Sequence, residues 1–392
     1  MFATLPLCIA GARLIGIGVS IVLILLLTSA CQPIQPPTAA APVASSSPAE
    51  GTEDSATPAS AEAASIAPTP KPTRRPRVKL DIVLEKLNSV ALAGNLLGDP
   101  TERKIQVVLP QGYAESNKRY PVVYMLHGYT GNESYGFEGK SIYEQVLRNG
   151  EAKEMILVFP NADNRLEGSF YLNSPTIGDY ETYISQEVVD YIDAHYRTLA
   201  TRDSRGIAGC SMGGDGAIHL GLTYPDVFGV AAPMSGQYHW LNDLGWKNVD
   251  GFSKLPANDD EFQTLPIEIR WLTAIAAGAA PNADKPPFFL DMPWEIVNGA
   301  PQVLPEVREK IAAASPWADA ADYSKQSQRL NSLLIYHGRL DAITPVEQVR
   351  AFDAYLTELG IKHDYLETDM GHCGDLAPVL SFMSEQLVAE EP

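Results

Sequence analysis

The chain has 392 residues and a net charge of −19, from 29 Lys and Arg residues against 48 Asp and Glu residues. A protein this acidic repels phosphate backbones, so we expect no nucleic-acid partner. Apolar residues make up 45% of the chain, which excludes wholesale disorder, and four cysteines are too few for a disulfide-stapled scaffold. Because there is no C-x-x-C pair and no ligand spacing among the histidines, we expect no structural zinc site. We also expect no catalytic metal and no cofactor.

The first thirty residues have the layout of an export signal. Arg13 precedes an apolar run from Leu14 to Leu27, and the run ends in Thr28-Ser29-Ala30-Cys31. Small residues before a cysteine, directly after such a run, resemble the bacterial lipoprotein signal. We therefore predict a signal peptide at 1–30 and a lipid on Cys31, which would tether the protein to a membrane of the bacterial cell envelope, outside the cytoplasm. An uncleaved N-terminal anchor helix is the alternative.

The segment that follows the predicted lipid site has the composition of a linker. Residues 32–73 are mostly Pro, Ala, Ser and Thr, and none is aromatic. Such a stretch cannot bury enough apolar surface to offset its ordering entropy. We predict that 31–77 form a lipidated cysteine and a disordered linker, and that 78–392 form one large domain.

The large domain alternates short apolar runs with helical patterns. The runs Pro121–Leu126 and Met155–Phe159 are continuously apolar, which is typical of strands buried on both faces. Further strands are expected at 103–109, 206–209, 230–232, 333–336 and 363–367, and helices at 180–196, 212–224 and 345–359. This alternation predicts an α/β fold, with a mostly parallel central sheet and helices on both faces.

A segment at about 238–328 interrupts this alternation. It is rich in Pro and Asp, and it holds all five tryptophans of the chain: Trp240, Trp246, Trp271, Trp294 and Trp317. Large rigid apolar side chains suit a lid over a binding cleft, so we predict a Trp-rich lid here. We select Trp240 and Trp294 as candidates that line the substrate. The alternative is that these rings pack only the insertion's own core.

One serine has the surroundings of a nucleophile. Gly209-Cys210-Ser211-Met212-Gly213 is the only G-x-S-x-G in the chain, and it joins an expected strand to an expected helix. The motif needs that context, because a sharp turn must lift the serine above the sheet edge and only glycine leaves room for the bend. Ser211 is therefore the predicted nucleophile.

A serine hydroxyl needs a base to take its proton, and the base needs an orienting acid. In this arrangement the acid and then the histidine should follow the serine, each just after a later strand. Asp341 follows the expected strand 333–336, and His372 follows the last expected strand. We predict Asp341 as the acid and His372 as the base.

The reaction also needs hydrogen-bond donors for an oxyanion. One should be the backbone N–H of Met212, directly after the nucleophile. The other should come from the turn after the strand that ends in His127-Gly128. Tyr129 is the preferred donor there, and Thr130 is the alternative.

With these residues in hand, the chain resembles the esterase D-like, or putative esterase, family of α/β-hydrolases. That family includes S-formylglutathione hydrolases, feruloyl and acetyl-xylan esterases, enterochelin esterases and mycolyltransferases. The resemblance rests on the segments VVLPQGY (107–113), RYPVVYMLHG (119–128), GCSMGG (209–214) and YPDVFG (224–229), and on the HGRLD and MGH segments around Asp341 and His372. It implies the α/β-hydrolase fold and ester chemistry. The Trp-rich insertion has no counterpart in this resemblance.

Two cysteines lie beside the predicted triad. Cys210 precedes Ser211, and Cys373 follows His372, so a serine–histidine hydrogen bond would bring the two cysteines within bridging range. A cysteine before the serine joined to one after the histidine resembles the tannase and fungal feruloyl esterase group. We predict a Cys210–Cys373 disulfide, with two buried thiols as the alternative.

These observations predict a membrane-tethered serine esterase that acts on a small-molecule or polysaccharide-linked ester through an acyl-enzyme intermediate. Acyl transfer to an alcohol other than water would use the same intermediate and is the alternative within the enzyme class. A catalytically silent solute-binding lipoprotein is the alternative from a different class.

Overall fold

We analysed a computed structural model of the protein, which describes residues 77–240 and 256–390. The predicted signal peptide, Cys31 and all of the linker except its last residue lie outside the described residues. Within the two described ranges, no helix combines the length and the apolar composition that crossing a membrane requires.

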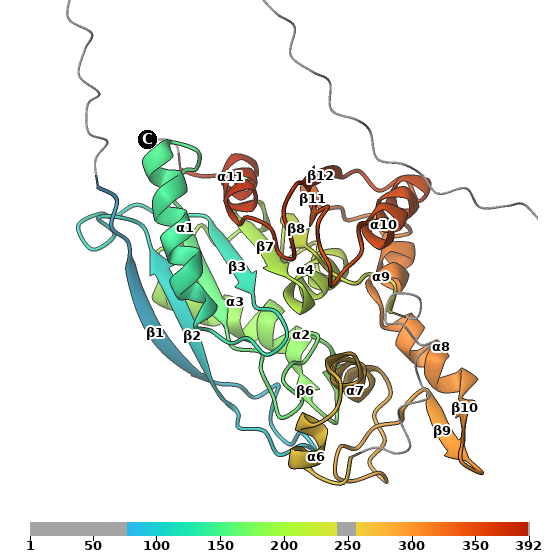
Figure 1. The fold of residues 1–392 in the computed structure, drawn as a ribbon. Helices are drawn as coiled ribbons and strands as arrows, with labels where there is room; N and C mark the ends of the chain where they lie inside the picture. The colour runs from blue at the N-terminus through green and yellow to red at the C-terminus, as the bar shows by residue number, and fades with distance from the viewer. Residues whose placement is uncertain (1–76, 241–255, 391–392) are drawn as a thin grey trace, which may run out of the picture. The chain divides into compact units, whose positions relative to one another are not determined.

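An eight-stranded sheet forms the centre of the domain (Figure 1). Its spatial order is β1-β2-β4-β3-β7-β8-β11-β12. The strands are β1 (Asp81–Asn88), β2 (Glu102–Leu109), β3 (Val122–Leu126), β4 (Ile156–Pro160), β7 (Arg205–Cys210), β8 (Val230–Met234), β11 (Ser332–Gly338) and β12 (Asp364–Thr368). Pairing is antiparallel at β1–β2 and β2–β4, and parallel between all neighbours from β4 to β12. All predicted strands are present, and the sheet is mostly parallel as predicted.

Both faces of the sheet are buried. In β3, Val122 and Tyr124 belong to one apolar core, whereas Val123 and Met125 belong to a second core on the opposite face. The helices α1 (Tyr135–Asn149) and α11 (Ala377–Gln386) pack against the second core. The first core is covered by α2 (Tyr180–Thr182), the π-helical segment η1 (Tyr183–Val188), α3 (Val189–His195), α4 (Met212–Thr223) and α10 (Val346–Glu358). Helices therefore cover both faces, as predicted.

The segment between β8 and β11 extends the first core (Figure 1). Its helices are α6 (Asp259–Gln263), α7 (Ile267–Ala279), α8 (Pro305–Ala313) and α9 (Pro316–Tyr323), and its strands β9 (Trp294–Val297) and β10 (Ala300–Val303) pair with each other. Two further short strands, β5 (Asn173–Ser174) and β6 (Gly178–Asp179), pair between β4 and α2. Leu272 of α7 and Ile311 of α8 are buried in the first core, so this segment packs on the sheet domain.

A buried charge cluster joins α9 to the body of the domain. Nδ1 of His219 on α4 lies 2.8 Å from the Asp319 carboxylate on α9, and Nε2 lies 3.4 Å from Glu181 on α2. Burial would lower the pKa of His219, but the carboxylates of Asp319 and Glu181 outweigh it and raise the pKa to about 10. His219 is therefore an imidazolium at neutral pH, held between two acids.

Candidate active site

Ser211 lies at the turn between β7 and α4. Its backbone has φ 58° and ψ −124°, a conformation that residues with a Cβ rarely adopt. The N–H of Ser211 donates to the carbonyl of Met234 at the end of β8 (2.9 Å), which fixes the turn to the neighbouring strand. The sharp turn predicted from the G-x-S-x-G motif is therefore present, with the serine at the carboxyl edge of the sheet.

The glycines around this turn are required by close backbone packing. A Cβ added at Gly209 would collide with the Gly213 carbonyl, and one added at Gly213 would collide with the carbonyl of Leu126. The first turn of α4 thus lies directly against the end of β3. Any larger residue at either position would push the turn of Ser211 away from the sheet.

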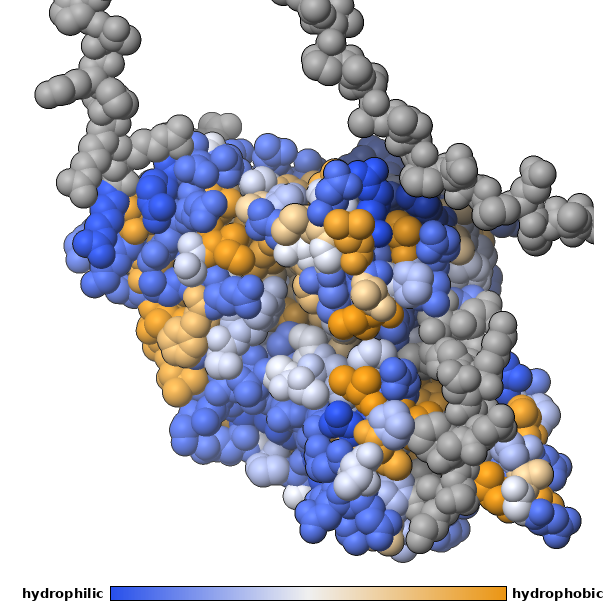
Figure 2. Space-filling view, viewed as in Figure 1, coloured by the Kyte–Doolittle hydropathy of each residue, from blue (hydrophilic) through white to orange (hydrophobic). Residues whose placement is uncertain are grey.

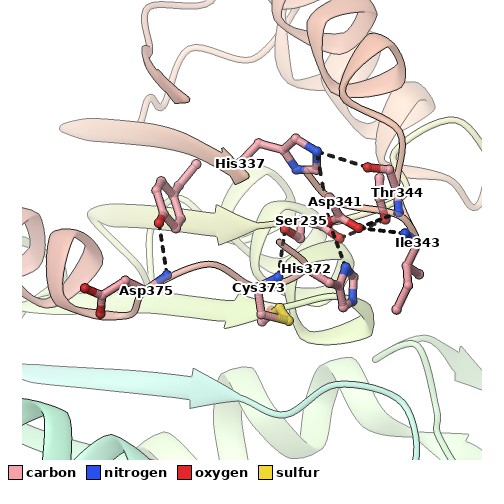
Figure 3. The surroundings of a disulfide bond; sticks show 10 residues. Ser235, His337, Asp341, Ile343, Thr344, His372, Cys373 and Asp375 are labelled. Carbon is pink, nitrogen blue, oxygen red and sulfur yellow. Dashed lines mark hydrogen bonds and ion pairs between the residues drawn. A yellow bond between two sulfur atoms is a disulfide. The ribbon is translucent and has the colours of Figure 1, made fainter. Parts of the chain in front are cut away.

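Asp341 and His372 are brought together by the loops that follow β11 and β12 (Figure 3). Nδ1–H of His372 donates to Asp341 Oδ2 (2.8 Å). The other carboxylate oxygen accepts the N–H groups of Ile343 (2.8 Å) and Thr344 (2.9 Å). Burial would raise the pKa of Asp341, but the hydrogen bonds from His372, Thr344 and Ile343 outweigh it and hold the pKa below its usual value. Asp341 is therefore a carboxylate, and it orients the imidazole of His372 through Nδ1.

Ser235, which the sequence reasoning missed, connects the loops of Asp341 and His372. It follows β8, is buried, and has φ 48°. Its hydroxyl accepts the N–H of Cys373 (3.1 Å), and its carbonyl accepts the hydroxyl of Thr344 (3.2 Å) (Figure 3). Since these partners are more than a hundred residues away in the chain, no local sequence signal marks Ser235.

A disulfide joins Cys210 to Cys373, with a Cα–Cα distance of 5.5 Å. It connects the residue before Ser211 to the residue after His372, which places the predicted nucleophile and base on backbone segments that are bonded to each other. A ring nitrogen of His372 and the two sulfurs lie within 4.8 Å of one another, the sole such cluster of possible metal ligands in the described residues. Because the sulfurs are bonded to each other, they are not thiolate ligands.

The loop after β3 lies beside Ser211. A Cβ built at Gly128 would lie 3.4 Å from the Cβ of Ser211. The N–H of Thr130 donates to the carbonyl of Glu167 (2.8 Å), so Thr130 is already engaged. The hydroxyl of Tyr129 donates to the carbonyl of Leu166 (2.8 Å) and fixes that residue in the loop. This arrangement favours Tyr129 over Thr130 as the second oxyanion donor. Met212, the other predicted donor, begins α4, where backbone N–H groups have no intrahelical partner.

His127 holds this loop in place through two hydrogen bonds. It is buried, its Nδ1 donates to the carbonyl of Gly128 (2.9 Å), and its Nε2 accepts the N–H of Ala162 (2.9 Å). Burial lowers the pKa of His127 to about 4, so the ring is neutral and serves both as donor and as acceptor.

A small recess opens beside Ser211. Its lining consists of Tyr129, Phe170, Ser211, Met212, Asp215, Gln237 and Trp271. Trp271 on α7 meets Tyr129 edge to face, with ring centroids 6.2 Å apart, so the segment between β8 and β11 does contribute an aromatic wall. Trp240 and Trp294 do not line this recess: Trp240 is buried against Phe170, and Trp294 is buried at the start of β9. Trp246 lies outside the described residues.

Comparison with known proteins shows that the chain is similar to esterases. The model of a family described as putative esterase matches residues 99–341. An esterase of Mycobacterium tuberculosis is 30% identical over 154 residues, which are 37% of this chain and 32% of that protein. An endo-1,4-beta-xylanase/feruloyl esterase of Xylanibacter ruminicola is 32% identical over 140 residues, which are 33% of this chain and 19% of that protein. The chain therefore spans at most about a third of the length of these relatives.

Solved structures share the fold at low sequence identity. A ferulic acid esterase superposes with a TM-score of 0.53 and 22% identity, covering 79% of this chain and all of the other. An S-formylglutathione hydrolase from Staphylococcus aureus gives a TM-score of 0.53 and 19% identity, covering 78% of this chain and 99% of the other. These superpositions confirm the α/β-hydrolase fold that the sequence predicted.

Proposed function

The chain belongs to the putative esterase family, and from this premise we propose that it is a serine hydrolase of carboxylic esters with Ser211, His372 and Asp341 as its catalytic triad. The single observation that supports the triad most is the hydrogen bond from His372 to Asp341, next to a disulfide that leads to the turn of Ser211. Neither the acid nor the base lies near Ser211 in the sequence, yet the fold brings their loops to the same edge of the sheet.

The proposed reaction follows from these positions. Nε2 of His372 accepts the hydroxyl proton of Ser211 while Oγ attacks the ester carbonyl. The Asp341 carboxylate keeps the proton on Nδ1 and stabilises the imidazolium that forms. The N–H groups of Met212 and Tyr129 would donate to the oxyanion. The imidazolium then protonates the leaving alcohol. In the second half of the reaction, water attacks the acyl-enzyme while Nε2 of His372 accepts its proton, and the imidazolium returns that proton to Ser211 as the acid product leaves.

Replacing the nucleophile tests this proposal directly. Ser211→Ala should lower the rate of p-nitrophenyl acetate hydrolysis by several orders of magnitude, because the members of a triad act as a unit. Ser141→Ala, an exposed serine on α1, is the matched control and should keep the wild-type rate. Near-ultraviolet circular dichroism checks that both variants are folded. A Ser211→Ala variant with more than about a tenth of the wild-type rate, a difference worth about 1.4 kcal/mol, would refute the assignment.

We also propose that the enzyme is exported and tethered to a membrane of the bacterial cell envelope through a lipid on Cys31. The support is the sequence pattern alone, an apolar run followed by small residues and a cysteine. Cys31→Ala should move the protein from the membrane fraction to the soluble fraction, or stall its processing, and it should leave the rate of ester hydrolysis unchanged. If the membrane fraction is unchanged and the N-terminal peptide of the wild-type protein carries no lipid mass, the uncleaved anchor helix becomes the better explanation.

A further inference from the structure

The proposed reaction fixes which part of an ester lies beside His372. The imidazolium must give its proton to the leaving oxygen, so that oxygen must come within about 3 Å of a ring nitrogen. The carbonyl oxygen points instead toward the N–H groups of Met212 and Tyr129, next to the aromatic recess. The alcohol portion of the ester therefore lies against the loops that follow β11 and β12, on the side of the site away from that recess.

These two loops expose large apolar side chains. Leu340 is 68% exposed, Ile343 45% and Met370 43%. The N–H of Leu340 donates to the carbonyl of Met370 (2.9 Å), so the two loops are joined at these residues. Figure 3 shows Ile343 beside His372, on the loop that holds Asp341. We call Leu340, Ile343 and Met370 the alcohol-side rim.

The charged residues next to the alcohol-side rim in sequence are paired. Arg339 and Asp369, which flank Leu340 and Met370 in sequence, form an ion pair with each other, and Asp341 is paired with His372. Figure 2 shows hydrophobic surface in the region where the loops after β11 and β12 lie in Figure 1. Exposed apolar side chains that cluster at a reacting centre indicate an apolar ligand, whereas scattered ones need no explanation.

We propose that the alcohol-side rim is a hydrophobic subsite for the leaving alcohol, so that the preferred substrates are esters of apolar alkyl or aryl alcohols rather than of sugars. This inference rests on the proposed function and adds the chemistry of the alcohol to it. The apolar part of the alcohol lies across Leu340, Ile343 and Met370 while its oxygen receives the proton from His372. A sugar hydroxyl network would find no polar side chain among these three residues.

A series of acetates of increasing alcohol length tests the subsite, with methyl, butyl and hexyl acetate compared with glyceryl monoacetate in the full-length protein. The simple alkyl alcohols differ little in acidity, so the chemical step is matched. Full burial of one methylene is worth about a factor of four, and on an open rim we expect about half of that free energy, a factor of about two per methylene. The ratio of kcat/KM for hexyl over methyl acetate should then be about 30.

The double variant Leu340→Ser/Met370→Ser should reduce this ratio to a few-fold. The ratio is taken within each variant, so a general loss of active protein cancels. Val90→Ser, which replaces an 81% exposed residue just beyond β1, is the control and should keep the ratio. A flat series, or faster hydrolysis of the glyceryl ester than of the hexyl ester, would overturn the subsite while leaving the esterase function intact. A steep series that survives the double variant would overturn the role of the rim. Failure to hydrolyse any acetate would instead overturn the proposed function.

Discussion

The Cys210–Cys373 disulfide closes a loop whose ends are 163 positions apart in the chain, and its removal should have a large effect on stability. We consider the double variant Cys210→Ala/Cys373→Ala, which removes the bond without leaving a free thiol. The chain-entropy relation assigns a loop of this size about 5 kcal/mol at 25 °C. The free energy of unfolding should therefore fall by up to about 5 kcal/mol, a large share of the stability of a typical domain.

Catalysis should respond as well, because the bond connects the turn of Ser211 to the loop of His372. Without it, the distance between the hydroxyl and the imidazole should vary more widely, and displacements of about 1 Å can cost a factor of about a hundred in rate. We expect kcat to fall by about tenfold or more while KM changes little, since the residues of the recess remain in place.

Guanidinium chloride unfolding and p-nitrophenyl acetate kinetics measure both effects. Wild-type protein should shift toward the variant when a dithiol reductant is added, and the variant should not respond to the reductant. The reasoning would be refuted if the free energy of unfolding of the variant were within about 1 kcal/mol of that of the oxidised wild type, because the closed loop is expected to contribute about 5 kcal/mol. Two free thiols in the protein recovered from an oxidising compartment would show that the bond does not form.

Three further changes probe the surroundings of the site. Asp341→Asn should lower kcat by about 10⁴-fold, because the amide would favour the wrong imidazole tautomer; an unchanged kcat would exclude Asp341 as the orienting acid. Ser235→Ala should leave the Cys373 N–H without its acceptor, destabilise the fold by about 1–3 kcal/mol in denaturant titrations and lower kcat more than it changes KM. His219 has its pKa raised from 6.5 to about 10 in the folded state, so its stabilisation is present below about pH 6.5 and is lost as the pH rises to about 10. The free energy of unfolding should fall across that interval in the wild type, and the His219→Gln variant should lack this contribution; equal slopes for the two proteins would contradict the pKa.

The sequence predicted the centre of the fold better than its edges. Continuous apolar runs identify β3 and β4 because buried parallel strands need apolar residues on both faces. The edge strand β1 gave no such signal, because its residues are exposed or half-buried. Helix α1 was missed because it contains Gly136 and Gly139, which weaken its helical pattern. The structure explains both glycines, since a Cβ at Gly136 would collide with the side chain of Gln106 and a Cβ at Gly139 would collide with the ring of Phe159.

The candidate site was likewise predicted only in part from the sequence. The order of Ser211, Asp341 and His372 along the chain, each after a strand, predicts a triad, and the structure brings the side chains of Asp341 and His372 together. The sequence did not predict which tryptophan lines the recess, because that depends on how α7 packs. Periodicity does not distinguish Trp271, which lines the recess, from Trp240, which lies buried behind Phe170. Ser235 was missed for a related reason, since its role exists only after distant loops have met.

The charge cluster of Glu181, His219 and Asp319 has a consequence for how a ligand reaches Ser211. Lifting α9 off α4 would separate buried charges, which costs several kcal/mol. Helices α7, α8 and α9 share one core, so Trp271 is held over the recess before any ligand arrives. Association should therefore be a single step without a closing motion. The observed rate of covalent labelling by a small organophosphonate should rise in proportion to its concentration, with neither a lag nor an early plateau.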